Sequence, residues 1–205
     1  MSARPDYTRK LVVVGDGGCG KTCLLTVFAS GRFPQEYVPT VFENTTKTVA
    51  CPTDPGKRLE WSLWDTAGQE EFDRIRPLSY QEVAVVVVVF AVNYRASLGN
   101  VGDKWYPEIS HFTPHTPTLL VGTKIDTRHS QTELSLMRTQ GQAPVTPEEG
   151  AAVAREIGAK AYLECSAMTG EGVARVFEEA WRVCARTGMG VRKRGQGEKR
   201  KCVVL

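Results

Sequence analysis

The sequence predicts an α/β fold, with a mostly parallel six-stranded sheet and helices on both of its faces. Three apolar runs, at residues 11–14, 83–92 and 118–122, do not alternate with polar residues, as expected of strands buried on both sides. Helical patterns, for example at 21–30 and 173–184, alternate with the strand-like runs, which favours a parallel sheet. Ligands of such sheets bind at the carboxyl ends of the strands.

The first half of the chain has clear local signals. A strand is expected at residues 10–14 and a helix at 21–30, which Gly31 ends because glycine readily takes the left-handed conformation that follows a helix. Residues 45–51 and 58–65 resemble two paired strands, and the proline- and glycine-containing segment between them reads as a turn.

The second half ends in a helix, a strand and a helix. Thr146 can cap a helix, Pro147 suits its first position and Glu149 completes a capping box. A last short strand is expected at residues 162–165. The final helix has one apolar face, which we assign to the core. That face consists of Val173, Val176, Phe177, Ala180, Trp181 and Cys184.

Length and composition indicate one soluble globular domain. The chain has 205 residues, of which 41% are hydrophobic and 24% charged, enough for a sizeable core. Its six cysteines lack paired spacing, so disulfide and zinc frameworks are not expected and a reducing compartment is favoured. We expect a flexible N-terminus at residues 1–8, the domain at 9–185 and a flexible tail at 186–205. No secretory signal is recognisable, and the longest apolar run is too short to span a bilayer.

The basic character of the chain lies in its C-terminal tail. Residues 192–201 contain six basic residues and one glutamate, whereas the whole chain has a net charge of +3. The domain itself is therefore slightly acidic, and no nucleic-acid partner is expected.

A phosphate-binding loop follows the first apolar run and precedes the first helix. The motif consists of Gly15, Asp16, Gly17, Gly18, Cys19, Gly20, Lys21 and Thr22, with Cys23 next to it. Glycines let backbone N–H groups turn toward a phosphate, and the helix adds its positive end. Lys21 can reach the β- and γ-phosphates, and the Thr22 hydroxyl can hold Mg²⁺.

A second motif, Asp65 to Gln69, stands at the end of the predicted strand pair. On its own a D-x-x-G sequence is a weak signal, but after a phosphate loop it gains meaning. Asp65 can hold Mg²⁺ through water, the Gly68 N–H can meet a γ-phosphate, and Gln69 can orient an attacking water.

A third group follows the later strands. Asp126 comes after Thr123 and Lys124, and its carboxylate can accept two N–H bonds from guanine, whereas adenine would leave it unsatisfied. Ser166 and Ala167 follow the last strand, where a backbone N–H can meet the guanine oxygen.

Together these motifs resemble a small GTPase of the Ras superfamily, and most closely the Rho family. The motifs that carry the resemblance to the Rho family lie at residues 15–22, 37–44, 63–70 and 104–108. The resemblance implies a P-loop NTPase G domain at 9–185, with the Rho-type insert helix at about 127–146. The sequence departs from the Rho pattern at four places. Gly18 stands where most Rho relatives have alanine, and Thr123 replaces the asparagine of the general superfamily motif. Thr45-Thr46 stand where an aromatic residue is usual, and the turn at 52–56 is longer than is typical.

The resemblance also implies roles for the remaining site residues. Phe33 would pack on the guanine ring and Tyr37 would close over the phosphates. Thr40 would ligate Mg²⁺ only in the GTP state, so that residues 33–44 form the first switch, and the second switch would run from Asp65 to about Arg76. The Lys124 stem would lie along the base. Expected partners of this monomer are exchange factors, GTPase-activating proteins, a Rho-type dissociation inhibitor and effectors that act in actin organisation or polarity.

The C-terminus is a C-a-a-X box that begins at Cys202, and its final leucine points to a geranylgeranyl group. One lipid chain binds membranes only marginally, and the basic tail supplies a second signal at an anionic surface. We therefore expect a lipid-anchored protein on the cytoplasmic face of the plasma membrane or endomembranes, with a cytosolic pool.

Two alternatives stay open at this point. A GTP-loaded scaffold that barely hydrolyses is disfavoured because Gly17 and Gln69 are both present, and an unrelated P-loop kinase or ATPase is disfavoured by Thr123 to Asp126. No arginine occurs in residues 33–44. The leading hypothesis is a GTP/GDP switch whose slow hydrolysis uses Mg²⁺, Lys21 and Gln69, with an arginine supplied by an activating protein.

Overall fold

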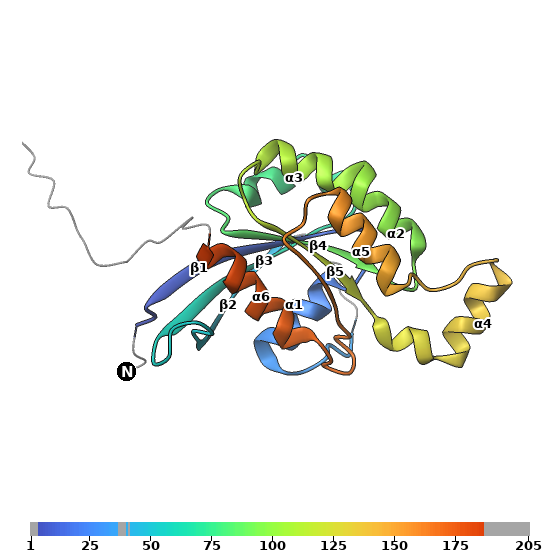
Figure 1. The fold of residues 1–205 in the computed structure, drawn as a ribbon, viewed down its shortest axis with the longest axis horizontal. Coiled ribbons are helices and arrows are strands. Elements are labelled where there is room, and N and C mark those ends of the chain that lie inside the picture. The colour runs from blue at the N-terminus through green and yellow to red at the C-terminus, as the bar shows by residue number, and fades with distance from the viewer. Residues whose placement is uncertain (1–3, 37–39, 41, 187–205) are drawn as a thin grey trace, which may run out of the picture.

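The structure, a computed structural model, describes residues 4–36, 40 and 42–186 (Figure 1). The strands are β1 (Tyr7–Val14), β2 (Phe42–Ala50), β3 (Arg58–Thr66), β4 (Val85–Ala91), β5 (Thr118–Thr123) and β6 (Ala161–Glu164). The α-helices are α1 (Lys21–Ser30), α2 (Arg95–Asn100), α3 (Tyr106–Phe112), α4 (Gln131–Thr139), α5 (Pro147–Glu156) and α6 (Val173–Arg186). Short turns of helix are η1 (Glu70–Phe72), η2 (Arg76–Tyr80), the π-helical η3 (Val101–Trp105) and η4 (Ile125–His129).

The strands form one sheet in the order β2-β3-β1-β4-β5-β6. Strand β1 pairs in parallel with β3 and β4, β5 pairs in parallel with β4 and β6, and only β2 runs antiparallel, against β3. The predicted six-stranded, mostly parallel sheet is therefore confirmed. The carboxyl ends of its five parallel strands meet at one edge, where the loops with the sequence motifs begin.

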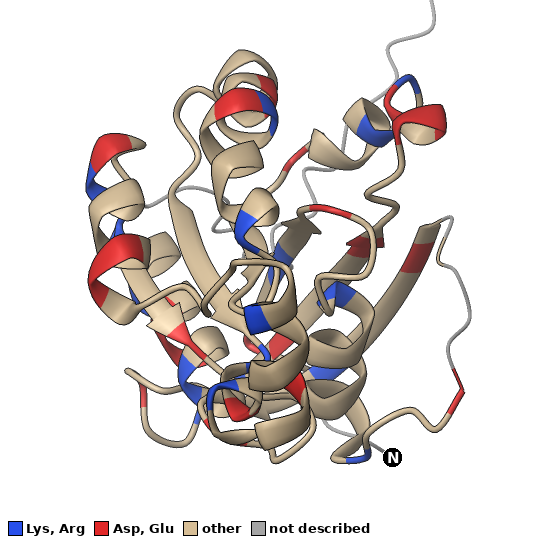
Figure 2. Cartoon of the chain, turned by 90° about the vertical axis from the view of Figure 1, so that its right-hand side faces the viewer, with Lys and Arg blue, Asp and Glu red and all other residues tan. Residues whose placement is uncertain are grey.

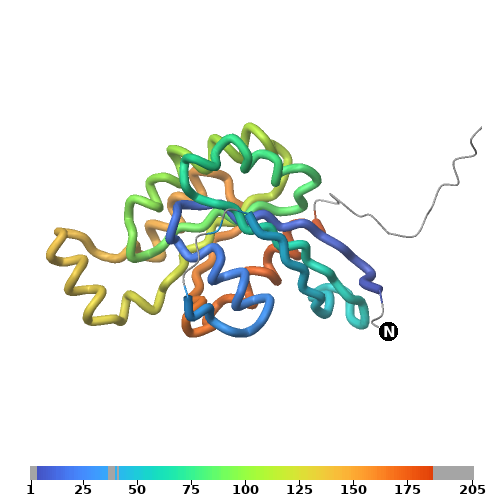
Figure 3. Tube along the Cα trace, turned by 180° about the vertical axis from the view of Figure 1, so that it is seen from behind, coloured from blue at the N-terminus to red at the C-terminus, as the bar shows by residue number. Residues whose placement is uncertain are grey.

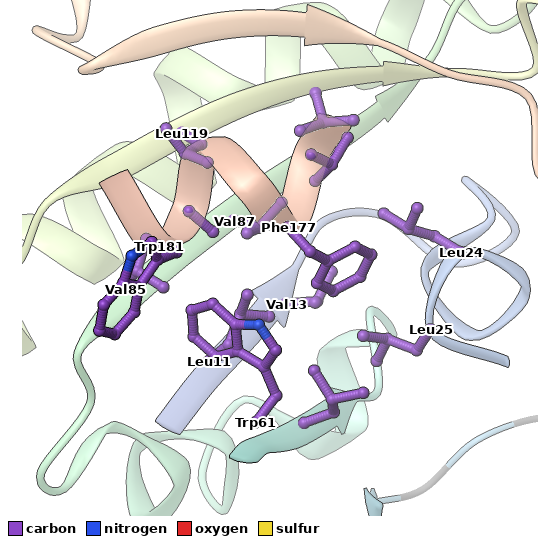
Figure 4. Packing of buried hydrophobic residues seen from close by; sticks show 14 of the residues in the cluster. Leu11, Val13, Leu24, Leu25, Trp61, Val85, Val87, Leu119, Phe177 and Trp181 are labelled. Carbon is purple, nitrogen blue, oxygen red and sulfur yellow. The ribbon is translucent and has the colours of Figure 1, made fainter. Parts of the chain in front are cut away.

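Helices cover both faces of the sheet (Figures 1 and 3). Leu11 and Val13 of β1 pack in a cluster with α1 and α6, part of which is shown in Figure 4. Val12 and Val14 point to the opposite cluster, formed with α2, η3, α3 and α5. Residues on both faces of β1 are buried, so the strand sequence does not alternate between apolar and polar residues. The apolar face predicted for α6 is confirmed, because all six of its residues are buried.

The first strand is longer than predicted. It begins at Tyr7 rather than at residue 10, so the assignment of Tyr7 and Thr8 to a flexible N-terminus is wrong. These residues pair with Leu59 and Glu60 of β3. The Tyr7 ring also packs on Trp181, with 5.2 Å between ring centroids. Tertiary pairing thus extends a strand whose first residues carry no apolar run.

The segment from α2 to α3 is helical, although no element was predicted there. Its three parts follow one another without a break, and none has a side-chain cap at its start. Helix propensity gives little further support to this segment, because two glycines and a proline lie within it. Val101, Trp105 and Ile109 are buried against the sheet, so burial of this face stabilises the helix in place of local signals.

The predicted helix ends at Gly31 and Thr146 are confirmed. Gly31 has φ of 74° and caps α1. At the start of α5, Thr146 Oγ1 accepts from the Glu149 N–H at 3.3 Å, and the Glu149 carboxylate accepts from the Thr146 N–H at 2.8 Å. Hydrogen bonds from Arg95 and from the Thr146 backbone lower the pKa of Glu149 to about 2.

Helix α4 lies within the 127–146 segment, at the edge of the molecule away from β1 (Figure 1). Ser130 caps it by accepting from the Glu133 N–H. Acidic and basic residues are interspersed along the helices and loops (Figure 2). Among the described residues, no helix is both long and apolar enough to cross a membrane.

Candidate nucleotide site

A cleft of about 470 Å³ opens at the carboxyl ends of β1 and β3. Its walls come from the phosphate loop, the segment before β2, the loop after β3 and the end of β5. The lining residues are Gly17, Gly18, Gly20, Lys21, Thr22, Cys23, Phe33, Pro34, Gln35, Glu36, Thr40, Glu43, Thr66, Ala67, Gly68, Gln69 and Lys124. Many of the site residues predicted from separate motifs thus share one cleft.

The phosphate loop closes around the Lys21 ammonium group. Lys21 is buried, and its Nζ donates to the carbonyl oxygens of Gly15 and Asp16, each at 2.8 Å. Gly15 has φ of 143°, and a Cβ there would lie 2.1 Å from the Val89 carbonyl oxygen. Only glycine fits this position. The loop geometry is thus fixed by its glycine and by the lysine it encloses.

Two residues of the helical segment between β4 and β5, Asn100 and Trp105, hold the phosphate loop through Asp16. The Asp16 carboxylate accepts from Asn100 Nδ2 and from Trp105 Nε1, each at 2.7 Å. Trp105 belongs to the 104–108 motif of the Rho resemblance, but the sequence assigns it no role, and Asn100 lies in none of the motifs. Both residues reach the loop through a helical segment that the sequence does not predict.

Three oxygen-bearing side chains meet on one side of the cleft. Thr22 Oγ1 lies 2.7 Å from Thr40 Oγ1, and Thr40 Oγ1 donates to Asp65 Oδ2 at 3.3 Å. The other oxygen of Asp65, Oδ1, is buried and has no hydrogen-bond partner among the described residues. Burial raises the pKa of Asp65, opposed by hydrogen bonds from Thr22 and Thr40 and by the charge of Lys21. Hydroxyl and carboxylate oxygens are the ligands that a hard divalent cation such as Mg²⁺ prefers, and the unpartnered Asp65 Oδ1 fits such a cation.

The loop after β3 lies directly on the phosphate loop. A Cβ at Gly68 would lie 2.4 Å from the Gly15 carbonyl oxygen and 2.4 Å from the Gly17 nitrogen. The Gln69 side chain reaches the same place, because a Cβ at Gly17 would lie 3.9 Å from Gln69 Cδ. The Gly68 backbone and the Gln69 side chain therefore lie against Gly15 and Gly17 of the phosphate loop.

The residues predicted to read the base gather at the ends of β5 and β6. Thr123 Oγ1 donates to the Cys19 carbonyl oxygen at 2.5 Å, and Ser166 Oγ donates to Asp126 Oδ1 at 2.5 Å. Lys124 has φ of 60°, a conformation that costs a non-glycine residue energy and often marks a functional position. Its Cε lies 3.9 Å from the position of a Cβ at Gly20.

Some predicted residues lie beside the cleft or outside the described part. Asp126, Ser166 and Ala167 do not line the 470 Å³ cleft. Phe33 lines it with 44% of its surface exposed. Tyr37 and Cys202 lie outside the described residues.

Comparison with known proteins decides the family. Residues 10–186 match the Ras family. The GTP-binding protein RHO1 of Saccharomyces cerevisiae is 49% identical over 202 residues, which cover 96% of this chain and 95% of that protein. The chain belongs to the Rho branch of the Ras family. It is a small GTPase.

Two further relatives agree. The GTP-binding protein rho4 of Schizosaccharomyces pombe is 48% identical over 203 residues, covering 99% of this chain and 96% of the relative. The GTP-binding protein rhoC of Emericella nidulans is 56% identical over 176 residues, covering 86% of this chain but only 62% of the relative. This Rho-family GTPase thus spans less than two thirds of rhoC and nearly the whole of the other two.

One of its departures from the Rho pattern has a clear structural setting. In the turn between β2 and β3, Asp54 accepts from the Tyr7 hydroxyl at 2.7 Å and Thr53 accepts from Trp181 Nε1 at 2.6 Å. The longer turn is therefore tied to β1 and α6. Gly18, by contrast, has open space around its Cβ position and φ of 74°, so alanine would meet backbone strain but no clash.

Proposed function

We propose that this Rho-family GTPase is a molecular switch that binds GTP or GDP with Mg²⁺ and hydrolyses GTP slowly. The observation that carries the proposal is the convergence of Thr40, Asp65 and Gln69 on the phosphate loop, at Thr22 and Gly17. Nucleotide extracted from the purified protein tests it. We expect guanine nucleotide in near-stoichiometric amount, and adenine nucleotide would contradict the proposal.

The protein groups of the cleft stabilise the charge of the phosphates. Lys21 would reach the β- and γ-phosphates, and backbone N–H groups of the loop would donate to them. Thr22, Thr40 and Asp65 would hold Mg²⁺, which would neutralise part of the phosphate charge when bound. Gln69 would orient the attacking water, and no covalent nucleophile is needed.

The switch itself would lie in the two segments that meet the γ-phosphate. Thr40 precedes β2 and Gly68 follows β3, so both flank one strand pair. With GTP bound, the Thr40 hydroxyl and the Gly68 N–H are held by contacts that hydrolysis removes. Effectors would then dock on the ordered segments.

Guanine selectivity would come from Asp126. Its carboxylate matches the two N–H donors on the edge of guanine, and adenine presents an acceptor there instead, which leaves a charged group without a partner. The Ser166 hydroxyl already donates to Asp126, which orients the carboxylate. Phe33 and the stem of Lys124 would cover the ring.

Asp65→Asn is expected to stabilise the nucleotide-free protein while removing the metal site. Burial raises the folded-state pKa of Asp65, so the ionised carboxylate opposes folding at neutral pH, and this effect is lost as the pH falls through the folded-state pKa. Without Mg²⁺ at pH 7, we expect Asp65→Asn to have a higher thermal unfolding midpoint than the native protein. The difference between the two midpoints should become smaller at acidic pH. GDP dissociation should no longer accelerate with EDTA.

The exposed Asp103 provides the control for this substitution. Asp103→Asn should change neither the unfolding midpoint nor the EDTA response. A lower midpoint for Asp65→Asn would argue against the buried-charge interpretation. Retained sensitivity to EDTA would argue against Asp65 as part of the magnesium site.

Membrane attachment would use the tail, which lies outside the described residues. A geranylgeranyl group on Cys202 and the basic residues before it would together give stable binding to an anionic membrane. Exchange factors, activating proteins, a Rho-type dissociation inhibitor and effectors would act on the anchored or extracted protein. A role in actin organisation or cell polarity rests on family analogy alone.

Cys202→Ser is expected to move the protein from the membrane fraction to the cytosol, because the remaining basic tail binds only through screened charge. Fractionation of cells that express each form measures this. Leu205→Ser is the matched control, since serine at the last position favours a farnesyl group and keeps a lipid. Membrane binding of Cys202→Ser that resists high salt would show that the lipid is dispensable.

A further inference from the structure

We propose that Arg76 is a positioning residue for Gln69 and that it fixes the loop after β3 against the phosphate loop. The inference rests on the proposed GTPase mechanism and adds a residue to it. Arg76 begins η2 and is 2% exposed. A buried arginine needs partners for its five N–H donors, and the identity of those partners carries the argument.

Two of the partners flank Gly68. Arg76 Nε donates to the Ala67 carbonyl oxygen at 3.1 Å, and its Nη2 donates to the Gln69 carbonyl oxygen at 3.4 Å. The other side of Gly68 touches Gly15 and Gly17. The segment that carries Gln69 is therefore enclosed between the phosphate loop and the Arg76 guanidinium.

The guanidinium is itself fixed by carboxylates. Arg76 Nη1 pairs with Glu108 of α3 at 2.6 Å, and Nη2 pairs with Asp73 at 2.5 Å. Glu108 also accepts from the Tyr80 hydroxyl at 2.5 Å, and Asp73 also pairs with Lys104 at 3.2 Å. Because two acidic groups balance its charge and direct it to the backbone, Arg76 is suited to orientation and not to contact with a phosphate.

The same assembly reaches the phosphate loop through Trp105. The Arg76 guanidinium lies over the Trp105 ring, 4.7 Å from its centroid, while Trp105 Nε1 donates to Asp16 at 2.7 Å. Trp105 is fully buried at the end of the π-helical turn η3, a type of turn that is frequent at functional sites. One indole thus sets the positions of the phosphate loop and the Gln69 loop relative to each other.

Arg76→Lys tests the proposal because lysine keeps the charge but lacks the planar set of donors. Protein preloaded with GTP and Mg²⁺ is followed through a single turnover, in the native background and in Gln69→Ala. We expect slowing of about 10-fold in the native background, below the ~10²-fold that a 1 Å misplacement can cost. In Gln69→Ala we expect no further slowing, because the residue that Arg76 positions is absent.

Arg128→Lys is a matched control. Arg128 pairs with Glu164 and donates to the Val145 carbonyl oxygen, and none of these three residues lines the cleft, so its replacement should lower thermal stability without slowing hydrolysis. If Arg76→Lys does not fold, Glu108→Gln serves instead, since it frees one end of the guanidinium. It should also slow hydrolysis only when Gln69 is present.

The outcomes separate this inference from the proposed function. Equal slowing in both backgrounds, or none in either, would overturn the positioning role of Arg76 while leaving the GTPase mechanism intact. Failure of the native protein to hydrolyse GTP at all would overturn the proposed function first.

Discussion

Gln69→Leu is expected to leave the protein in the GTP-bound state. The Gln69 amide lies beside Gly17 in the cleft, where it can orient water toward a γ-phosphate, and leucine has no polar group for this task. An arginine supplied by an activating protein accelerates such reactions by about 10³- to 10⁵-fold, or ~4–7 kcal/mol of barrier. We expect most of that acceleration to be lost, as measured by single-turnover phosphate release with an activating domain.

Gln140→Leu is the control for replacing a glutamine by a leucine. Gln140 follows α4, remote from the cleft, so both the slow intrinsic reaction and its acceleration should persist. GTP affinity should be retained in Gln69→Leu, since the glutamine is assigned to the water and not to the nucleotide. Unchanged hydrolysis by Gln69→Leu would refute the role of Gln69.

Gly68→Ala is the second substitution with a large expected effect. The added Cβ would lie 2.4 Å from backbone atoms of Gly15 and Gly17, and neither can move without opening the phosphate loop. The loop after β3 must therefore lift away, and its N–H can no longer reach a γ-phosphate. A hydrogen bond to a charged group contributes about 1.5–3 kcal/mol, so GTP affinity should fall roughly 10- to 100-fold.

The affinity for GDP distinguishes this explanation from general damage. GDP lacks the γ-phosphate, so its binding to Gly68→Ala should change little, and hydrolysis of GTP should be lost. Gly99→Ala is the matched control, because nothing lies within 4 Å of its Cβ position. Equal weakening of GTP and GDP would mean that Gly68 supports the loop as a whole and not the γ-phosphate contact.

The sequence predicted those parts whose signals are local. The glycine loop, the caps at Gly31 and Thr146 and the apolar face of α6 depend on residues close together in the chain, and all form as expected. The fold class also predicted ligand binding at the carboxyl ends of the parallel strands, and the cleft lies at this edge, although Asp126, Ser166 and Ala167 do not line it.

The residues that hold the site in place could not be predicted from local signals. Asn100, Trp105 and Arg76 act across 84, 89 and 7 to 9 positions of sequence, and two of them lie in a helix stabilised by burial, without caps. A tryptophan or arginine in isolation is most simply assigned to the core or to the surface. Only the fold shows that these residues converge behind the phosphate loop and the Gln69 loop.

Single-turnover hydrolysis of GTP, with and without a Rho-type activating domain, tests the central claim most directly. No arginine occurs in residues 33–44, so we expect slow hydrolysis by the protein alone and acceleration by about 10⁵-fold when the activating domain supplies one. Fast hydrolysis by the protein alone would contradict the inference that the catalytic arginine must come from an activating protein. GTP that stays bound and intact with the activating domain would contradict the switch and favour a GTP-loaded scaffold.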